Sequence, residues 1–364
     1  MKIKNIVTYL ETVAPLSYQE SYDNSGLIVG DLQQELTSVL ITIDTIEGVV
    51  DEAIELGANL IVSHHPIVFS ALKKITGANY IERTIIKAIK NNISIYACHT
   101  NLDSIIGGVN SKICEKLELV NCKILAPKQN ELQKLITFVP VSHLNNIQEA
   151  LFKAGAGNIG NYDKCGFSTQ GNGSFKASQG TKPFVGEIGK VHIEKEARFE
   201  TVFPKNIQNK VISALIKAHP YEEVAYDIYA LQNEYSKVGM GMIGELKNEI
   251  NELDFLKKIK NVFKTESIRY TDLLNKKINK VAVCGGSGNF LLKNAIVAKA
   301  DIFVSSDFKY HQFFDAENKI LIADIGHYES EQYTKDVFYS LLTKKFPNFA
   351  FYFSKINSNP INYL

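Results

Sequence analysis

Tryptophan is absent from this chain of 364 residues, and only five residues are cysteine. No two cysteines have the CxxC spacing of a zinc ribbon or a thioredoxin-like motif. An odd number of scattered cysteines also argues against a disulfide framework and suits a reducing compartment. The five are Cys98, Cys114, Cys122, Cys165 and Cys284.

An excess of charge is missing as well, since 40 lysines and arginines balance 39 aspartates and glutamates to a net charge of +1. The sequence therefore gives no strong signal for nucleic acid or a membrane surface. No apolar run is long enough to cross a bilayer. The first residues, MKIKNIVTYLETV, carry Glu11 among helically spaced apolar residues, which predicts a first helix rather than a signal peptide. We expect a cytoplasmic protein.

Both outer parts of the chain alternate short apolar strands with helices. The length suits two or three domains. Continuously apolar strands separated by helices predict a parallel sheet covered on both faces, and therefore an α/β fold. A helix over 80–90, another after Gly107-Gly108, one over 289–300 and a long one from His327 fit this pattern. The expected strands are 38–43, 59–63, 93–98, 279–284, 301–305, 319–325 and 349–354.

The middle of the chain has a different pattern. LITFVPVSHLNNIQEALFKAGAG and FETVFPKNIQNKVISALIKAHP repeat the order strand, proline, helix, which predicts a ferredoxin-like α+β domain. The polar, glycine-rich residues 155–190 are expected to form a long mobile excursion between the two halves of this domain. The predicted organisation is two α/β halves, 1–127 and 239–364, that form one core, interrupted by an inserted domain at 128–238.

Three loops at expected strand ends carry side chains that can bind metal. In open parallel sheets, ligands bind at the carboxyl ends of the strands. SHHP places His64 and His65 after one strand, and Pro66 forces a turn in which two neighbouring histidines can converge. The other two loops are CHTNLDS, with His99 and Asp103, and DIGHYESEQ, with His327, Glu329 and Glu331.

The spacing within the third loop selects two of its residues. His327 and Glu331 are four residues apart at the start of a helix, so they share one face, whereas Glu329 points elsewhere. Imidazoles mixed with carboxylates suit zinc, iron or manganese. If Asp103 and Glu331 each use both oxygens, they could bridge two ions about 3.5–4 Å apart.

Two further signals leave alternatives open. Asp307 and His311 follow another strand end, where they either orient a metal ligand or serve as a helix cap and a stacked histidine. CGGSGNFLL, with Gly285 to Gly288, is either a tight turn or a phosphate-binding turn before a helix. His219, Glu222 and Glu223 have no partner loop, so we expect them to be structural.

Four motifs in order resemble the GTP cyclohydrolase 1 type 2 homologues, or dinuclear-metal-centre proteins. They are YDNSGLIVGD, SHHP, HTNLDSIIGGVN and GHYESE, and the longer family members also share HPYEEVAYD in an inserted domain. The resemblance implies a homohexamer with metal sites facing an internal cavity. Tyr22 stands where the family motif usually begins with tryptophan. The implied ligands of two divalent ions are His64, His65, Asp103, His327 and Glu331.

Three functions fit these residues. The first is a metal-dependent hydrolase in which a bridging hydroxide attacks an electrophilic carbon or phosphorus and His99 carries protons. The resemblance suggests GTP or another phosphate-containing small molecule as substrate. The second is a protein that stores or delivers metal, and the third is a regulatory hexamer without catalysis.

Overall fold

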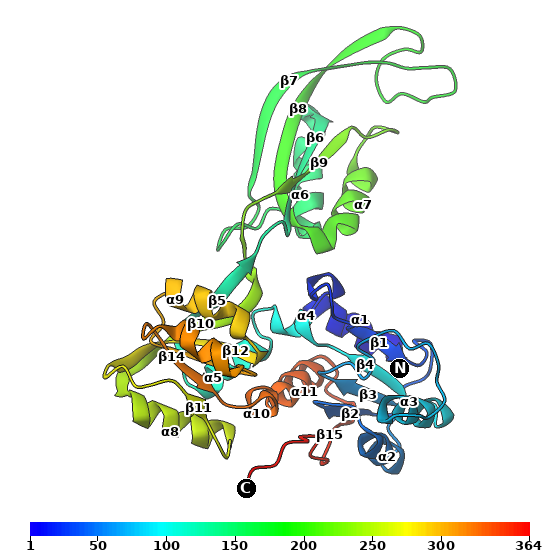
Figure 1. Cartoon of the computed structure of the whole chain (residues 1–364). Helices are drawn as coiled ribbons and strands as arrows, with labels where there is room; N and C mark the ends of the chain where they lie inside the picture. The colour runs from blue at the N-terminus through cyan, green and yellow to red at the C-terminus, as the bar shows by residue number, and fades with distance from the viewer. The chain divides into compact units, whose positions relative to one another are not determined.

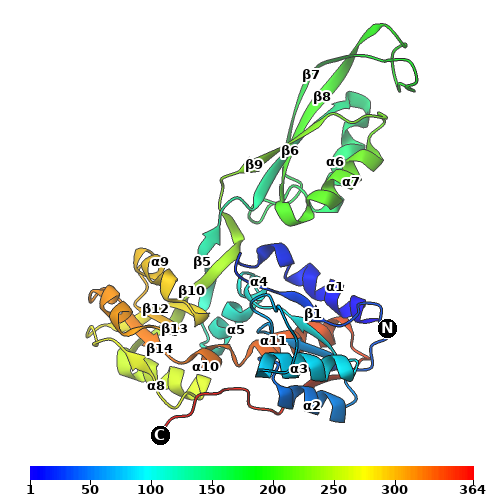
Figure 2. The same ribbon diagram turned by 45° about the vertical axis from the view of Figure 1, so that its right-hand side comes forward.

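A computed structural model describes all 364 residues, which form two compact units (Figures 1 and 2). The first consists of Met1–Pro127 together with Lys237–Leu364, and the second of Lys128–Ser236. The fold is mixed α/β, as the sequence predicts. None of its helices combines the length and the apolar character needed to cross a membrane.

The first sheet of the first unit has the strand order β1-β4-β3-β2-β15. Strands β15, β2, β3 and β4 are parallel, and β1 pairs with β4 in the antiparallel sense. Every residue of β2, β3 and β4 is buried, as expected for strands covered on both faces. The strands are β1 (Gly26–Val29), β2 (Val39–Thr42), β3 (Leu60–Ser63), β4 (Ser94–Ala97) and β15 (Phe351–Phe353).

Helices cover this sheet because their apolar residues recur at helical spacing. Val49, Val50 and Ala53 of one helix and Ala88 of the next share a core with Ile61 of β3. The predicted long helix from His327 is two helices, since α10 ends at Glu331 and α11 begins at Thr334. The helices are α1 (Ile3–Val13), α2 (Glu47–Glu55), α3 (Tyr80–Lys90), α4 (Thr100–Asp103), α5 (Val109–Lys116), α10 (His327–Glu331) and α11 (Thr334–Lys345).

The second sheet of this unit has the order β11-β14-β13-β12-β10-β5. Its strands β12, β13 and β14 are parallel, whereas β10 and β11 are antiparallel to their partners. The outer core is therefore two sheets. Each receives a strand from the other half of the chain, β15 in the first sheet and β5 in the second. Its elements are β5 (Val120–Lys128), β10 (Tyr235–Asn251), α8 (Glu252–Phe263), β11 (Arg269–Tyr270), β12 (Lys277–Ser287), α9 (Leu292–Val297), β13 (Ile302–Ser306) and β14 (Leu321–Asp324).

The second unit is a four-stranded antiparallel sheet of order β7-β8-β6-β9 with two helices on one face. Its succession β-α-β-β-α-β is that of ferredoxin-like domains. Pro140 and Pro204 end β6 and β8, and each is followed by a short turn into a helix. The elements are β6 (Leu132–Pro140), α6 (Leu144–Ala154), β7 (Gly166–Lys176), β8 (Val191–Pro204), α7 (Gln208–Ala218) and β9 (Tyr226–Leu231).

The expectation of a mobile excursion over 155–190 is wrong for its central part. Residues 166–176 form β7, which pairs with β8 along its whole length in regular register. The sequence GFSTQGNGSFK has a low intrinsic preference for strand because of its glycines. Pairing with β8 therefore decides its conformation.

The first unit is expected to fold without the second. The two cut ends adjoin, because a Cβ on Gly239 would lie only 2.7 Å from the Cα of Pro127. Replacing residues 128–238 by a short Gly/Ser linker should leave a protein with cooperative thermal unfolding and an α/β circular dichroism spectrum. A longer deletion that also removes β10 takes away the neighbour of β12 and should not fold. Failure of the shorter deletion to fold would place 128–238 in the core.

Candidate metal centre

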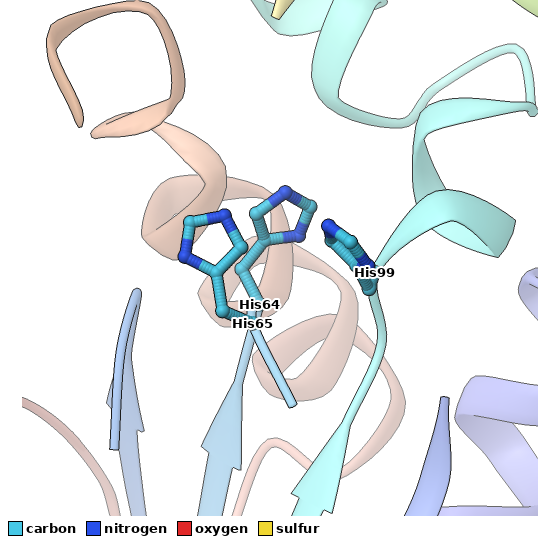
Figure 3. Close-up of side chains that lie close together, drawn as sticks. All are labelled: His64, His65 and His99. Atoms are coloured by element: carbon cyan, nitrogen blue, oxygen red, sulfur yellow. The ribbon is translucent and has the colours of Figure 1, made fainter. Parts of the chain in front are cut away.

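A tight turn after β3 aims two neighbouring histidines at one point. The backbone N–H groups of His64 and His65 both donate to the carbonyl of Ile43, at 3.1 and 3.0 Å. The turn thus cancels the alternation that would place neighbouring strand residues on opposite faces. His99 follows the adjacent strand β4, and its ring faces the other two (Figure 3). Ring nitrogens of all three lie within 4.8 Å of one another.

The third loop reaches this point from the other sheet of the unit. His327 and Glu331 lie on α10, directly after β14. Nε2 of His327 is 3.3 Å from Nε2 of His65, and Oε2 of Glu331 is 2.9 Å from the same nitrogen. Oε1 of Glu331 and Oδ1 of Asp103 lie 3.6 and 3.7 Å from Nε2 of His64. The carboxyl ends of two different sheets therefore meet at one cluster.

Every imidazole in the cluster is held through its Nδ1 atom. Nδ1 of His64 bonds to the carbonyl of Cys98, while the other three bond to carboxylates. Such outer partners fix the orientation and the tautomer of a histidine and leave Nε2 for a ligand. The carboxylate partners are Asp44 for His65 (2.7 Å), Asp23 for His99 (2.8 Å) and Asp307 for His327 (2.6 Å).

This donor set fits a divalent cation. A carboxylate accepts hydrogen bonds, so the Nδ1 atoms of His65 and His327 carry hydrogens, and their Nε2 atoms, 3.3 Å apart, are left to bind either a proton or a cation. Two nitrogens bound to one tetrahedral zinc ion at 2.0–2.1 Å are about 3.4 Å apart. Nε2 of His64 and Oδ1 of Asp103 are buried and form no hydrogen bond. Cations bound among them would satisfy these four atoms.

The raised pKa values of three groups in the cluster also show that positive charge is favourable there. Burial alone would lower the pKa of His65, but Glu331 and Asp44 raise it to about 10. In the same way Glu331 and Asp307 overcome burial and raise the pKa of His327 to about 11. Burial and the charge of Glu331 raise the pKa of Asp103 to about 8. In the protein without metal, protons therefore occupy the cluster.

Glycines of β12 provide the space for Glu331. A Cβ on Gly286, whose φ is +63°, would lie 2.3 Å from Oε1 of Glu331. The N–H of Gly285 donates to Oδ1 of Asn110, and the N–H of Gly286 donates to Oγ of Ser330. These two N–H groups are thus already used and cannot hold a phosphate, so the tight turn is the better interpretation of this motif.

The structure brings together all six residues that the sequence singles out, namely His64, His65, His99, Asp103, His327 and Glu331. Asp307 also bonds to His327. His311 instead packs beside Tyr310 and Phe314, away from the cluster. Glu329 is likewise apart and accepts a hydrogen bond from Asn359.

Sequence reasoning missed two carboxylates of the site. Asp44 follows the strand over 38–43, so its place at a strand end was a usable signal. Asp23 lies in YDNSGL, far from any other site residue in sequence, and nothing local links it to His99. Its carboxylate also accepts from Thr100. Burial would raise the pKa of Asp23, but the bonds from His99 and Thr100 hold it far below its usual range.

A cavity of about 490 Å³ opens beside the cluster. Tyr22 and Phe69 stack at its edge with ring centroids 6.4 Å apart, and both rings are about half exposed. Neither lysine nor arginine lines the cavity. The space suits a small molecule with a flat ring.

Removing metal should make stability depend on pH. His65 and His327 have pKa values raised above 6.5, so the folded apoprotein binds more protons than the unfolded chain between about pH 6.5 and 10. Its free energy of unfolding should therefore fall as the pH rises through this range. Differential scanning calorimetry of chelated and metal-loaded protein measures the effect. A bound cation replaces the protons, so the free energy of unfolding of the metal-loaded form should fall less over the same pH range. An equal dependence on pH in the chelated and the metal-loaded protein would contradict the proposed exchange of protons for metal.

Known proteins share both the sequence and the fold. Residues 1–360 match the family model Duf34/NIF3 (NGG1p interacting factor 3). A Bacillus subtilis protein named GTP cyclohydrolase 1 type 2 homolog is 39% identical, over 99% of this chain and 98% of its own. A Bacillus cereus protein related to NIF3 has a crystal structure that covers 100% of this chain and 99% of its own, with a TM-score of 0.87 and 38% identity. The resemblance seen in the four motifs is thus confirmed, and the chain belongs to the Duf34/NIF3 family.

Proposed function

We propose that this protein is a metal-dependent hydrolase that holds two divalent ions. His64, His65, Asp103, His327 and Glu331 would be the ligands, with zinc, iron or manganese as the metal. The observation that supports this most is the convergence of the Nε2 atoms of His64, His65 and His327, each anchored through Nδ1, on two buried carboxylates. Two groups that share Glu331, His64-Asp103-Glu331 and His65-His327-Glu331, offer places for two ions.

The ions, when bound, would supply Lewis acidity and lower the pKa of water towards neutrality. His99 would move the proton. Because Asp23 stays ionised and accepts from Nδ1 of His99, the free lone pair of His99 is on Nε2, among the other histidines. From there it can take a proton from water and return it to a leaving group. Asp23 acts as a positioning residue for that tautomer.

The cavity favours a substrate with a flat ring, placed against Tyr22 and Phe69. A purine nucleotide fits this description, and the name of the Bacillus subtilis relative suggests GTP. Since neither lysine nor arginine lines the cavity, the negative charge of a phosphate would have to be balanced by the ions.

The metal content provides the first test. Purified protein reconstituted with zinc or manganese should carry about two ions per chain in elemental analysis, because five ligands with two carboxylates exceed one tetrahedral site. Asp103→Ala should lose at least one ion, and His99→Ala should keep both. Asp51→Ala, which removes an exposed partner of Lys87, is the matched control. One ion or none in the unmodified protein would contradict the dinuclear centre.

Turnover provides the second test. In single-turnover assays with a panel of nucleotides, metal-loaded protein should release product, and activity should disappear in parallel with chelation. His99→Ala and Asp23→Asn should slow turnover by about 10²-fold or more while metal content stays unchanged, as expected for loss of a proton carrier. Bound metal without turnover of any nucleotide would contradict the hydrolase and favour storage or delivery of metal.

The remaining parts of the proposal concern assembly and organisation. A homohexamer follows from the family resemblance, and light scattering on the same preparation counts the chains. A cytoplasmic location follows from the cysteine pattern. Residues 128–238 would be an inserted ferredoxin-like domain that contributes no metal ligand.

A further inference from the structure

The second unit contains a cavity of its own, of about 670 Å³. It lies on the sheet face opposite the two helices. Ala197 and Phe199 of β8 are buried beneath α6 and α7, so the alternate residues Glu196 and Arg198 point to the other face, where they line the cavity. This size is within the range of small-molecule sites.

Three aromatic rings form part of the cavity wall. Phe175 comes from β7, Phe184 from the loop between β7 and β8, and Tyr221 from the segment between α7 and β9. The centroid of the Tyr221 ring is 6.1 Å from that of Phe175 and 6.2 Å from that of Phe184. The ring planes are inclined by 57° and 49°, so the rings enclose a corner rather than stack.

A buried carboxylate faces the same corner. Glu196 is only 8% exposed, and its Oε1 accepts from the hydroxyl of Tyr221 at 2.8 Å. No basic side chain pairs with Glu196, because Arg198 is engaged with Glu200 at 3.0 Å. A buried carboxylate with a single neutral donor is costly, and a positive charge in the cavity would offset that cost.

Two glycines of β7 keep the floor of the cavity open. A Cβ on Gly173 would lie 2.0 Å from Oε2 of Glu196, so a side chain there would displace the carboxylate. A Cβ on Gly171 would meet nothing within 4 Å. Glycine weakens a strand interior and is often found where a ligand approaches the backbone. The glycines that argued against a strand in the sequence therefore shape this hollow.

The wall is fixed before any ligand binds. Nε2 of His219 bonds to the carbonyl of Phe138, and Nδ1 of His219 accepts from the N–H of Tyr221. Burial lowers the pKa of His219, in keeping with a neutral ring that both donates and accepts. Glu222 accepts from the N–H of Lys182 and so ties the loop that carries Phe184. A preformed site spares a ligand the cost of ordering it.

From this geometry we propose that the second unit binds a small organic cation, an ammonium-type head group held by Glu196 within the rings of Phe175, Phe184 and Tyr221. Aromatic faces attract such cations, and the attraction grows when water is excluded. Three carboxylates among the lining residues outnumber two basic groups, which disfavours phosphates and other anions. The site is separate from the metal cluster and does not depend on it.

Choline and its uncharged isostere 3,3-dimethylbutan-1-ol provide a matched pair of probes. Because the chain has no tryptophan, Phe184→Trp introduces at the cavity the only tryptophan of the full-length protein, which can be excited selectively over the tyrosines. Choline should change its fluorescence saturably, and the isostere should bind at least about tenfold more weakly. Calorimetry with the unmodified protein repeats the comparison without the reporter. Equal binding of the two probes, or no choline binding in calorimetry, would overturn the proposal.

Variants that replace a carboxylate by a neutral amide identify the residue that binds the cation. Glu196→Gln keeps an acceptor for Tyr221 but loses the charge, so it should weaken choline binding about tenfold or more. Glu149→Gln, on α6 of the same unit and paired with Lys164 outside the cavity, is the matched control and should bind normally. Unchanged binding by Glu196→Gln would refute the assignment. So would inorganic phosphate that displaces choline, or a tryptophan that acrylamide cannot reach because another copy covers the cavity.

Discussion

Four imidazoles whose Nε2 atoms face one another are unfavourable unless positive charge lies between them. In this protein the orientation of each ring is fixed through its Nδ1 atom, which forms a hydrogen bond with a carbonyl or a carboxylate. The rings therefore cannot turn away to relieve the repulsion of their lone pairs. The high pKa values of His65 and His327 show the same demand, met by protons where no metal ion is bound.

This constraint determines what the surrounding fold must supply. Two sheets present their carboxyl ends to each other, so that β3 and β4 contribute the first histidines and β14 leads into α10. The turn at Ile43 and the glycines of β12 remove the steric obstacles to that meeting. Loops can bring such residues close together, but short turns on buried strands hold them at a fixed separation.

Much of the site could be predicted because its histidines and two of its carboxylates lie at strand ends, where apolar runs give way to polar residues within a few positions. Asp23 could not be inferred in this way, because it precedes β1 and follows no strand. The exchange of β15 and β5 between the sheets also escaped prediction, since apolar periodicity shows that a strand exists but not where it pairs. Strand β7 was missed because its glycine-rich composition disfavours a strand. The cavity that these glycines shape was missed for the same reason.

Because each sheet contains a strand from the other half of the chain, the exchange of strands also determines when each sheet can form during synthesis. The first sheet requires Phe351–Phe353, near the end of the chain, and those residues pair with β2, more than 300 positions earlier. A ribosome releases the C-terminus last, so a growing chain has its first histidine pair long before the sheet that supports it is finished. Contacts of such high sequence separation slow folding. Any cation that this cluster binds would therefore find its complete site only after Phe351–Phe353 have been made, whereas the unfinished chain already carries the neighbouring imidazoles of His64 and His65.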